Sequence, residues 1–159
     1  MCCGFRGWEL AFSRLPPHLK DLLSREASVL AADCAGLPST LLHGDAKVAN
    51  FGLLPNGGVA AFDWSNVAAA PVGMELGWYL AVNATRLAGT KEEAIARYRR
   101  ALETSLGEAQ PEPIWRRTLE LCALGGARML LWNKALALET GGARARVEWD
   151  WWVERLAAL

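Results

Sequence analysis

Residues 41–66 read LLHGDAKVANFGLLPNGGVAAFDWSN, the densest run in the chain of polar residues that could carry chemistry. Two apolar runs, at 51–54 and 59–62, flank the sequence Pro55-Asn56-Gly57-Gly58. Asn-Gly supplies the positive φ angles of a tight turn, so this stretch predicts a small β-hairpin. The residues before it, 39–45, predict a short buried strand that ends in a polar loop.

The predicted hairpin would bring two distant polar residues to one place. Asn50 lies just before its first strand and Asp63 just after its second, so both return to the same end of the ribbon. Their side-chain oxygens are hard ligands that suit Mg²⁺, which takes its remaining ligands from phosphates and water. In the preceding loop, Asp45 is placed to accept a proton from a hydroxyl nucleophile. Lys47 adds a charge that can neutralise a transferring phosphoryl group.

Each of these residues also has a simpler interpretation. Gly-Asp is common turn chemistry, and a lysine such as Lys47 is usually solvated. His43 suits a hydrogen-bonded structural role better than the role of a base. The combination is more specific than its parts, because an asparagine, a hairpin and an Asp-Trp pair follow His-Gly-Asp in order.

The spacing Asp45-x-Lys47-x-x-Asn50 matches the D-x-x-x-x-N catalytic loop of protein kinases, with the lysine that serine/threonine kinases carry in it. His-Gly-Asp, with Asp63-Trp64 in place of the kinase D-F-G, is more specifically similar to the aminoglycoside phosphotransferase family. That family includes choline and other small-molecule kinases and has a protein-kinase-like fold. The flanking segments LPSTLLHGD and AFDWSNVAAAPVGMELGWYLA agree with it, and the resemblance covers about residues 15–85.

The resemblance implies a role for each residue of the site. Asp45 is the expected catalytic base, and His43 orients the loop. Asn50 and Asp63 bind Mg²⁺, and Lys47 contacts the phosphates of the cofactor ATP. The implied reaction transfers the γ-phosphoryl group of ATP to a hydroxyl of a small molecule. One departure is Glu75, which stands where the family commonly carries a shorter aspartate that supports the loop from a helix.

A second departure concerns the nucleotide lobe. Kinase-like folds hold ATP between two lobes, and the smaller lobe supplies a glycine-rich strand pair and a lysine. The 42 residues before His43 contain no G-x-G-x-x-G and no V-A-I-K-like strand. We therefore expect the carboxyl-terminal lobe alone, from a truncated or split chain, with weak nucleotide binding and little or no turnover by itself. The alternative is a kinase-like lobe that serves as a non-catalytic binding or scaffold module.

Helical periodicity accounts for most of the remaining chain. The expected fold is mainly α with a small β-hairpin, the carboxyl-terminal lobe of a protein-kinase-like (α+β) fold. We expect one domain over 1–159, with the catalytic loop and metal-site hairpin at 41–66 and a helical remainder at 72–159. Gly125-Gly126 is a candidate bend in the fourth of the predicted helices, which we expect to be the central buried one. The predicted helices are 17–33, 72–88, 91–107, 111–139 and 145–159.

Composition narrows the function classes. The 17 basic and 17 acidic residues balance, so no basic excess indicates a nucleic-acid partner. No apolar run reaches the length of a membrane span. The four cysteines are scattered, which favours free thiols in a cytoplasmic protein. The expected partners are a small-molecule hydroxyl substrate and either a missing amino-terminal lobe or a second copy of the chain.

The residues allow one other class of enzyme, and they leave the substrate open. A metal-dependent hydrolase could use His43, Asp45 and Asp63, but only two histidines are present and a zinc centre is poorly supplied. The substrate itself is not identified by the sequence. Acidic side chains near the end of the chain could grip a polycation, although solvated helix charges are the simpler reading. These are Glu139, Glu148, Asp150 and Glu154.

Overall fold

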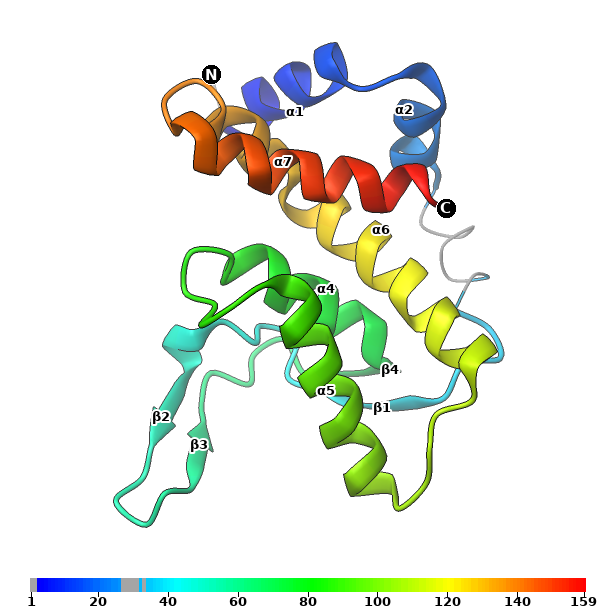
Figure 1. Cartoon of the computed structure of the whole chain (residues 1–159), viewed down its shortest axis with the longest axis vertical. Helices are drawn as coiled ribbons and strands as arrows, with labels where there is room; N and C mark the ends of the chain where they lie inside the picture. Colours follow the sequence, from blue (N-terminus) through cyan, green and yellow to red (C-terminus); the bar gives the residue numbers. More distant parts are fainter. Residues whose placement is uncertain (1–2, 27–31, 33) are drawn as a thin grey trace.

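The computed structural model describes residues 3–26, 32 and 34–159 (Figure 1). The described part is mainly helical, with two small antiparallel sheets, β1 with β4 and β2 with β3. The mainly α arrangement that the sequence predicts is confirmed. The elements in order are α1 (Cys3–Arg14), α2 (Pro17–Ser24), β1 (Ser39–Leu42), the 3₁₀ turn η1 (Val48–Asn50), β2 (Phe51–Leu53), β3 (Val59–Ala61), β4 (Ala68–Pro71), α4 (Val72–Val82), α5 (Lys91–Leu106), α6 (Glu112–Ala137) and α7 (Gly142–Ala157).

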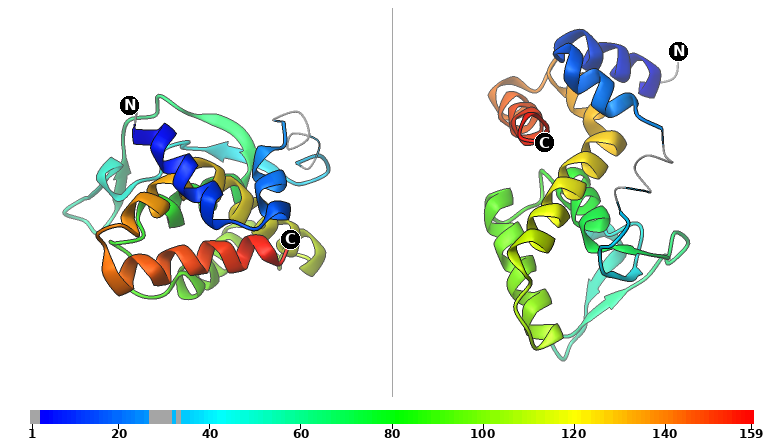
Figure 2. Two further views of the ribbon diagram at one scale, coloured as in Figure 1. Left: turned by 90° about the horizontal axis from the view of Figure 1, so that it is seen from above. Right: turned by 90° about the vertical axis from the view of Figure 1, so that its right-hand side faces the viewer.

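Helix α6 runs through the middle of the molecule and organises the rest. Helices α1, α2 and α7 gather around its carboxyl-terminal half, while α4, α5 and the strands lie toward its amino-terminal half (Figures 1 and 2). The prediction of a central buried helix over 111–139 is therefore confirmed. None of the helices in the described part is long and apolar enough to cross a membrane.

The Gly125-Gly126 pair, the candidate bend in α6, is a point of close packing against α4. Helix α6 is assigned as one helix through this pair, where α4 lies very close. A Cβ atom on Gly126 would stand 2.6 Å from the carbonyl oxygen of Gly77, and one on Gly77 would stand 2.3 Å from that of Cys122. Both positions need glycine because the two helix backbones nearly touch.

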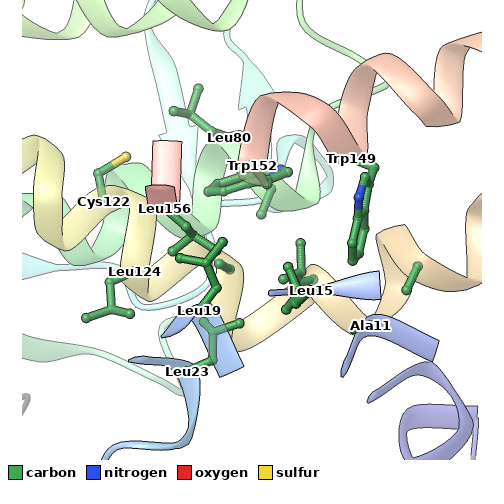
Figure 3. Packing of buried hydrophobic residues seen from close by; sticks show 14 of the residues in the cluster. Ala11, Leu15, Leu19, Leu23, Leu80, Cys122, Leu124, Trp149, Trp152 and Leu156 are labelled. Atoms are coloured by element: carbon green, nitrogen blue, oxygen red, sulfur yellow. The ribbon is translucent and has the colours of Figure 1, made fainter. Parts of the chain in front are cut away.

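The hydrophobic core lies between α1, α2, α4, α6 and α7 (Figure 3). Leu15, which follows α1, and Leu19 of α2 meet Trp149, Trp152 and Leu156 from α7 there. Those three α7 residues are buried. Burial of this apolar surface is the main stabilising contribution that holds the helices together.

The amino-terminal region departs from the sequence prediction. The sequence indicated no helix over 3–14, yet α1 forms there and packs on α6. The helix predicted over 17–33 ends at Ser24, because Arg25 is extended and its carbonyl accepts a hydrogen bond from Arg128 at 2.6 Å. The rest of the predicted range lies largely outside the described residues, which omit 27–31 and 33.

Two other boundaries differ from the prediction. The helix predicted over 72–88 ends at Val82, and the side chain of the next residue, Asn83, accepts a hydrogen bond from Val48 in the polar loop after β1. Strand β1 is exposed along most of its length, with only Leu42 buried, so the expectation of a buried strand was wrong. It is held instead by β4, which pairs with it from Ser39 opposite Pro71 to Leu42 opposite Ala68.

Candidate active site

The polar loop that follows β1 is held in place by Glu75, in the first turn of α4. The backbone N–H groups of His43 and Gly44 donate to its two carboxylate oxygens, at 3.0 and 2.7 Å. The support that the family draws from an aspartate is thus supplied here by the longer glutamate. Two charge-assisted hydrogen bonds fix the backbone of the loop just before Asp45.

The other end of the loop is held by Asn83, which is fully buried at the carboxyl end of α4. Its Oδ1 accepts from the Val48 N–H at 2.8 Å, and its Nδ2 donates to the Ala46 carbonyl at 3.1 Å. The sequence analysis did not single out this residue. An asparagine inside an otherwise apolar helix is the signal that could have found it, since a buried amide needs polar partners.

Asp45 is the buried carboxylate at the centre of the loop. Its Oδ1 accepts from Trp78 Nε1 at 3.0 Å, and its Oδ2 accepts from Lys47 Nζ at 2.5 Å and Asn50 Nδ2 at 3.0 Å. Burial pushes the pKa of Asp45 upward, but these hydrogen bonds outweigh it and hold the pKa below 3.8. The group is therefore ionised at neutral pH. A carboxylate offers about four acceptor positions, so one remains on Oδ1.

The ring of His43 contacts the backbone of Asp45, and both of its nitrogen atoms are engaged. Its Nδ1 accepts from the Asp45 N–H at 3.3 Å, and its Nε2 lies 2.9 Å from the Phe62 carbonyl. This pattern assigns the neutral tautomer with the proton on Nε2, which then donates to Phe62. The ring is covered by Trp64, with 4.5 Å between ring centroids. The geometry gives His43 a positioning role between the loop and the end of the hairpin.

The predicted hairpin is present as β2 and β3, with Phe51 opposite Ala61 and Leu53 opposite Val59. Its turn is longer than a two-residue turn, because the Leu54 N–H donates to the Gly58 carbonyl. Of the Asn-Gly pair only Gly57 has a positive φ, at 82°. Asn56 contributes instead through its side chain, whose Oδ1 accepts from the Gly58 N–H at 3.0 Å.

The open end of the hairpin brings the two predicted metal ligands together. The Phe62 N–H donates to the Asn50 carbonyl at 3.0 Å, so Asp63 directly follows the residue that pairs with Asn50. Asp63 has a φ of 65°, a left-handed conformation that aspartate tolerates better than most residues. Its Oδ1 accepts from the Ser65 hydroxyl at 2.9 Å. A backbone conformation of this kind is more common at functional sites than elsewhere.

The side chains of Asn50 and Asp63 offer oxygen atoms, the kind of ligand that suits Mg²⁺. Asn50 uses its Nδ2 to donate to Asp45, which leaves its Oδ1 as a ligand. Asp63 offers an exposed carboxylate. A site with two protein oxygens suits an ion that keeps waters and phosphates as its other ligands. Zinc is poorly served, because the described residues contain no group of three or more His, Cys, Asp or Glu side chains that could hold a metal.

Lys47 is ion-paired to Asp45 and about one third exposed, rather than freely solvated. The hydrogen bond to Asp45 and, more weakly, the charge of Asp63 raise the pKa of Lys47. The structure thus brings together the loop residues and the hairpin residue that the sequence selected. Trp78, which the sequence analysis missed, joins them from α4.

Gly44 gives a direct test of how tightly this loop is built. Its φ is 78°, and a Cβ atom there would lie 2.0 Å from the Asn66 carbonyl oxygen. We expect Gly44→Ala to lower the free energy of unfolding by about 2 kcal/mol, through both the strained φ and the backbone clash. Urea unfolding followed by circular dichroism would measure the change.

The control for that substitution is Gly57→Ala in the hairpin turn. Gly57 has the same sign of φ, at 82°, but no atom lies within 4 Å of the added Cβ. Only the left-handed strain applies there, about 1 kcal/mol. Equal effects at the two positions would show that the approach of Asn66 to the loop does not constrain Gly44.

The acidic side chains near the carboxyl terminus are only partly free. Glu148 forms ion pairs with two largely buried lysines, Lys91 and Lys134, so reading it as a solvated helix charge was wrong. Glu139 pairs with Arg6, whose Nη2 lies 2.8 Å from each carboxylate oxygen. Asp150 and Glu154 are exposed, as expected for solvated charges.

Comparison of the sequence with known proteins gives one match, to a family model. The family model described as the phosphotransferase enzyme family matches residues 5–121. The matched span contains the loop, the hairpin and α4, and it extends into α6. Neither a curated protein nor a solved structure matches the chain.

Proposed function

The chain belongs to the phosphotransferase enzyme family, and from that premise we propose that it takes part in the transfer of the γ-phosphoryl group of ATP to a hydroxyl of a small molecule. In this proposal the described residues form the catalytic lobe of a protein-kinase-like fold. One observation supports it above the others. The Asp45 carboxylate is held by Trp78, Lys47 and Asn50, and the hairpin places Asp63 beside Asn50.

Asp45 would position the acceptor hydroxyl through the acceptor position left on Oδ1. As the acceptor oxygen bonds to the γ-phosphorus and the bond to ADP breaks, the hydroxyl proton passes to Asp45. A carboxylate with a lowered pKa is a weak base. That is sufficient here, because the transition state of phosphoryl transfer is loose and catalysis depends mainly on positioning and charge.

Asn50 and Asp63 would hold Mg²⁺, which when bound neutralises charge on the phosphate oxygens. Lys47 donates one of its three N–H groups to Asp45, and the others are free to reach the phosphoryl group. Glu75 and Asn83 keep the loop backbone fixed while these groups act. Catalysis of this kind depends on groups that are already oriented before reaction.

A second candidate is a binding or scaffold lobe without activity. It is favoured by apolar side chains exposed on the strands beside the site, including Leu41, Leu53 at 86% and Val59. Exposed apolar surface, where it is extensive, usually marks a site that another molecule or domain covers. In the catalytic proposal the same surface receives the nucleotide base or the lobe that carries it.

Binding of a metal–nucleotide complex tests the site without requiring turnover. We expect Mn²⁺, which accepts the same oxygen ligands as Mg²⁺, to bind with ATP, and Asp63→Asn to weaken that binding at least about tenfold. Electron paramagnetic resonance of free Mn²⁺ during titration measures the affinity. Asp150→Asn, which removes an exposed carboxylate from α7, is the matched control.

The outcomes separate the two candidates. Unchanged Mn²⁺–ATP binding in Asp63→Asn would remove Asp63 from the metal site. Wild-type protein that self-associates and binds no Mn²⁺–ATP would favour the scaffold lobe. Metal–nucleotide binding that needs Asp63, together with release of ADP, would support the phosphotransferase.

A further inference from the structure

A cleft of about 530 Å³ opens between α4 and α5, two helices that lie side by side in Figure 1. Its volume falls in the range of roughly 300–1,000 Å³ that is usual for small-molecule sites. Leu76 and Leu87 contribute apolar wall, and Tyr79 and Tyr98 line it with their rings. Ala46, the residue after Asp45, forms part of the wall, so the cleft adjoins the catalytic loop.

Two arginines on this cleft have no polar partner among the described residues. Arg86 follows α4 and Arg97 lies on α5, and both side chains are exposed. Within the described ranges neither guanidinium forms a hydrogen bond or an ion pair. Tyr79 and Tyr98 likewise direct no hydroxyl hydrogen bond to the described residues. The cleft therefore has an excess of unused donors.

The carboxylates that line the same cleft are already engaged. Both oxygens of Glu75 accept backbone N–H groups from the catalytic loop. Glu93 accepts from the Thr90 N–H at 3.1 Å, as the second half of the capping box that begins α5. The formal charges of the two glutamates and two arginines cancel. Their use in hydrogen bonds differs, because the two glutamates already accept three backbone N–H groups while the two guanidinium groups donate to none of the described residues.

We propose that the cleft between α4 and α5 binds a small amphipathic anion, a molecule with an apolar body and a carboxylate or phosphate group. The apolar body packs between Leu76 and Leu87, and the anionic oxygens accept from Arg86 and Arg97. Guanidinium groups recognise both kinds of anion with paired N–H donors. A ligand here would touch Ala46 and Glu75, so its presence would further restrain the catalytic loop.

Isothermal titration calorimetry of the full chain with three ten-carbon probes tests the charge preference. The probes are decanoate, decyl phosphate and decyltrimethylammonium, each kept below the concentration at which it forms micelles. We expect one molecule of decanoate or decyl phosphate to bind per chain, with a dissociation constant on the order of 100 μM. The tighter of the two identifies the anionic group. The cationic probe should bind at least about tenfold more weakly.

Substitutions then locate the bound probe. Arg97→Gln and Arg86→Gln should each weaken binding of the better anion about tenfold, the loss of a charge-assisted hydrogen bond. Arg100→Gln is the matched control, since Arg100 is an exposed arginine on the same helix outside the cleft. Ala101→Trp, at an exposed position on the cleft wall, should block binding by filling the space. Circular dichroism establishes that each variant is folded.

Three results would overturn the proposal. They are equal affinity for the cationic probe, no binding of either anion to the folded chain, and equal weakening by Arg100→Gln and the two cleft substitutions. None of these measurements requires phosphoryl transfer. The proposal about the cleft can therefore fail while the proposed catalytic function stands, and the reverse also holds.

Discussion

An Asp45→Asn variant is expected to lose about three orders of magnitude in the rate of phosphoryl transfer while keeping its fold. The amide retains the shape of the side chain and one oxygen that can accept from Trp78. It has no negative charge to orient the acceptor hydroxyl and no site for its proton. Lys47 is already about one third exposed, so its ammonium can be solvated when the ion pair is lost.

The measurement is release of ADP from ATP with Mg²⁺, in the presence of pooled small molecules that carry hydroxyl groups. Mn²⁺–ATP binding should stay close to the wild-type value, because Asn50 and Asp63 are unchanged. Glu154→Gln removes an exposed carboxylate far along the chain and should retain full activity. A variant that keeps more than a tenth of wild-type turnover would show that Asp45 is not the group that positions the hydroxyl.

The loop and the hairpin could be predicted because their signals are local. Gly57 marks the turn, and the spacing from Asn50 to Asp63 follows from the hairpin itself. Local signals of this kind could not predict the contacts that hold the loop. Trp78 and Asn83 reach atoms 33 and 35 residues earlier in the chain, and no periodicity links positions so far apart. Only the packing of α4 against the loop brings them there.

Helix α1 was missed for a related reason. Its sequence contains Gly4 and Gly7, which lower helix propensity. The structure shows what Gly7 does, because a Cβ atom there would stand 2.6 Å from the Trp132 carbonyl oxygen in α6. Helices in proteins draw most of their stability from packing. Gly7 therefore disfavours an isolated helix, yet its lack of a side chain is what allows α1 to approach α6.

The ion pairs of Glu148 could not be predicted from the sequence either, because its surroundings come from three helices. Lys91 begins α5 and Lys134 lies near the end of α6, and both are only 8% exposed. Glu148 pairs with Lys91 and lies 3.3 Å from Lys134 Nζ, and its Oε1 also accepts from Trp152 Nε1 at 2.9 Å. One carboxylate therefore compensates two buried ammonium groups. A pattern of acidic residues on a helix surface gives no sign of this arrangement.

Glu148→Ala is expected to lower the free energy of unfolding by about 3–5 kcal/mol at neutral pH, because it leaves Lys91 and Lys134 buried without a counter-charge. Chemical denaturation measures the change. The control is Glu139→Ala, since Glu139 is 33% exposed and its partner Arg6 is 57% exposed. A surface pair of this kind contributes about 0–1 kcal/mol. A loss no larger at Glu148 than at Glu139 would contradict the buried network.

The loss of unfolding free energy in Glu148→Ala should also depend on pH, in a direction that the pKa of Glu148 sets. Burial pushes the pKa of Glu148 upward, but its hydrogen bonds and the two lysine charges outweigh this and hold the pKa below 4.5. A carboxylate with a lowered pKa in the folded state stabilises the fold fully above its unfolded pKa. That stabilisation is lost as the pH falls through the lowered folded value. The difference in unfolding free energy between the wild type and Glu148→Ala should therefore shrink below pH 4.5, whereas a cavity left by the missing side chain would produce a difference that does not change with pH.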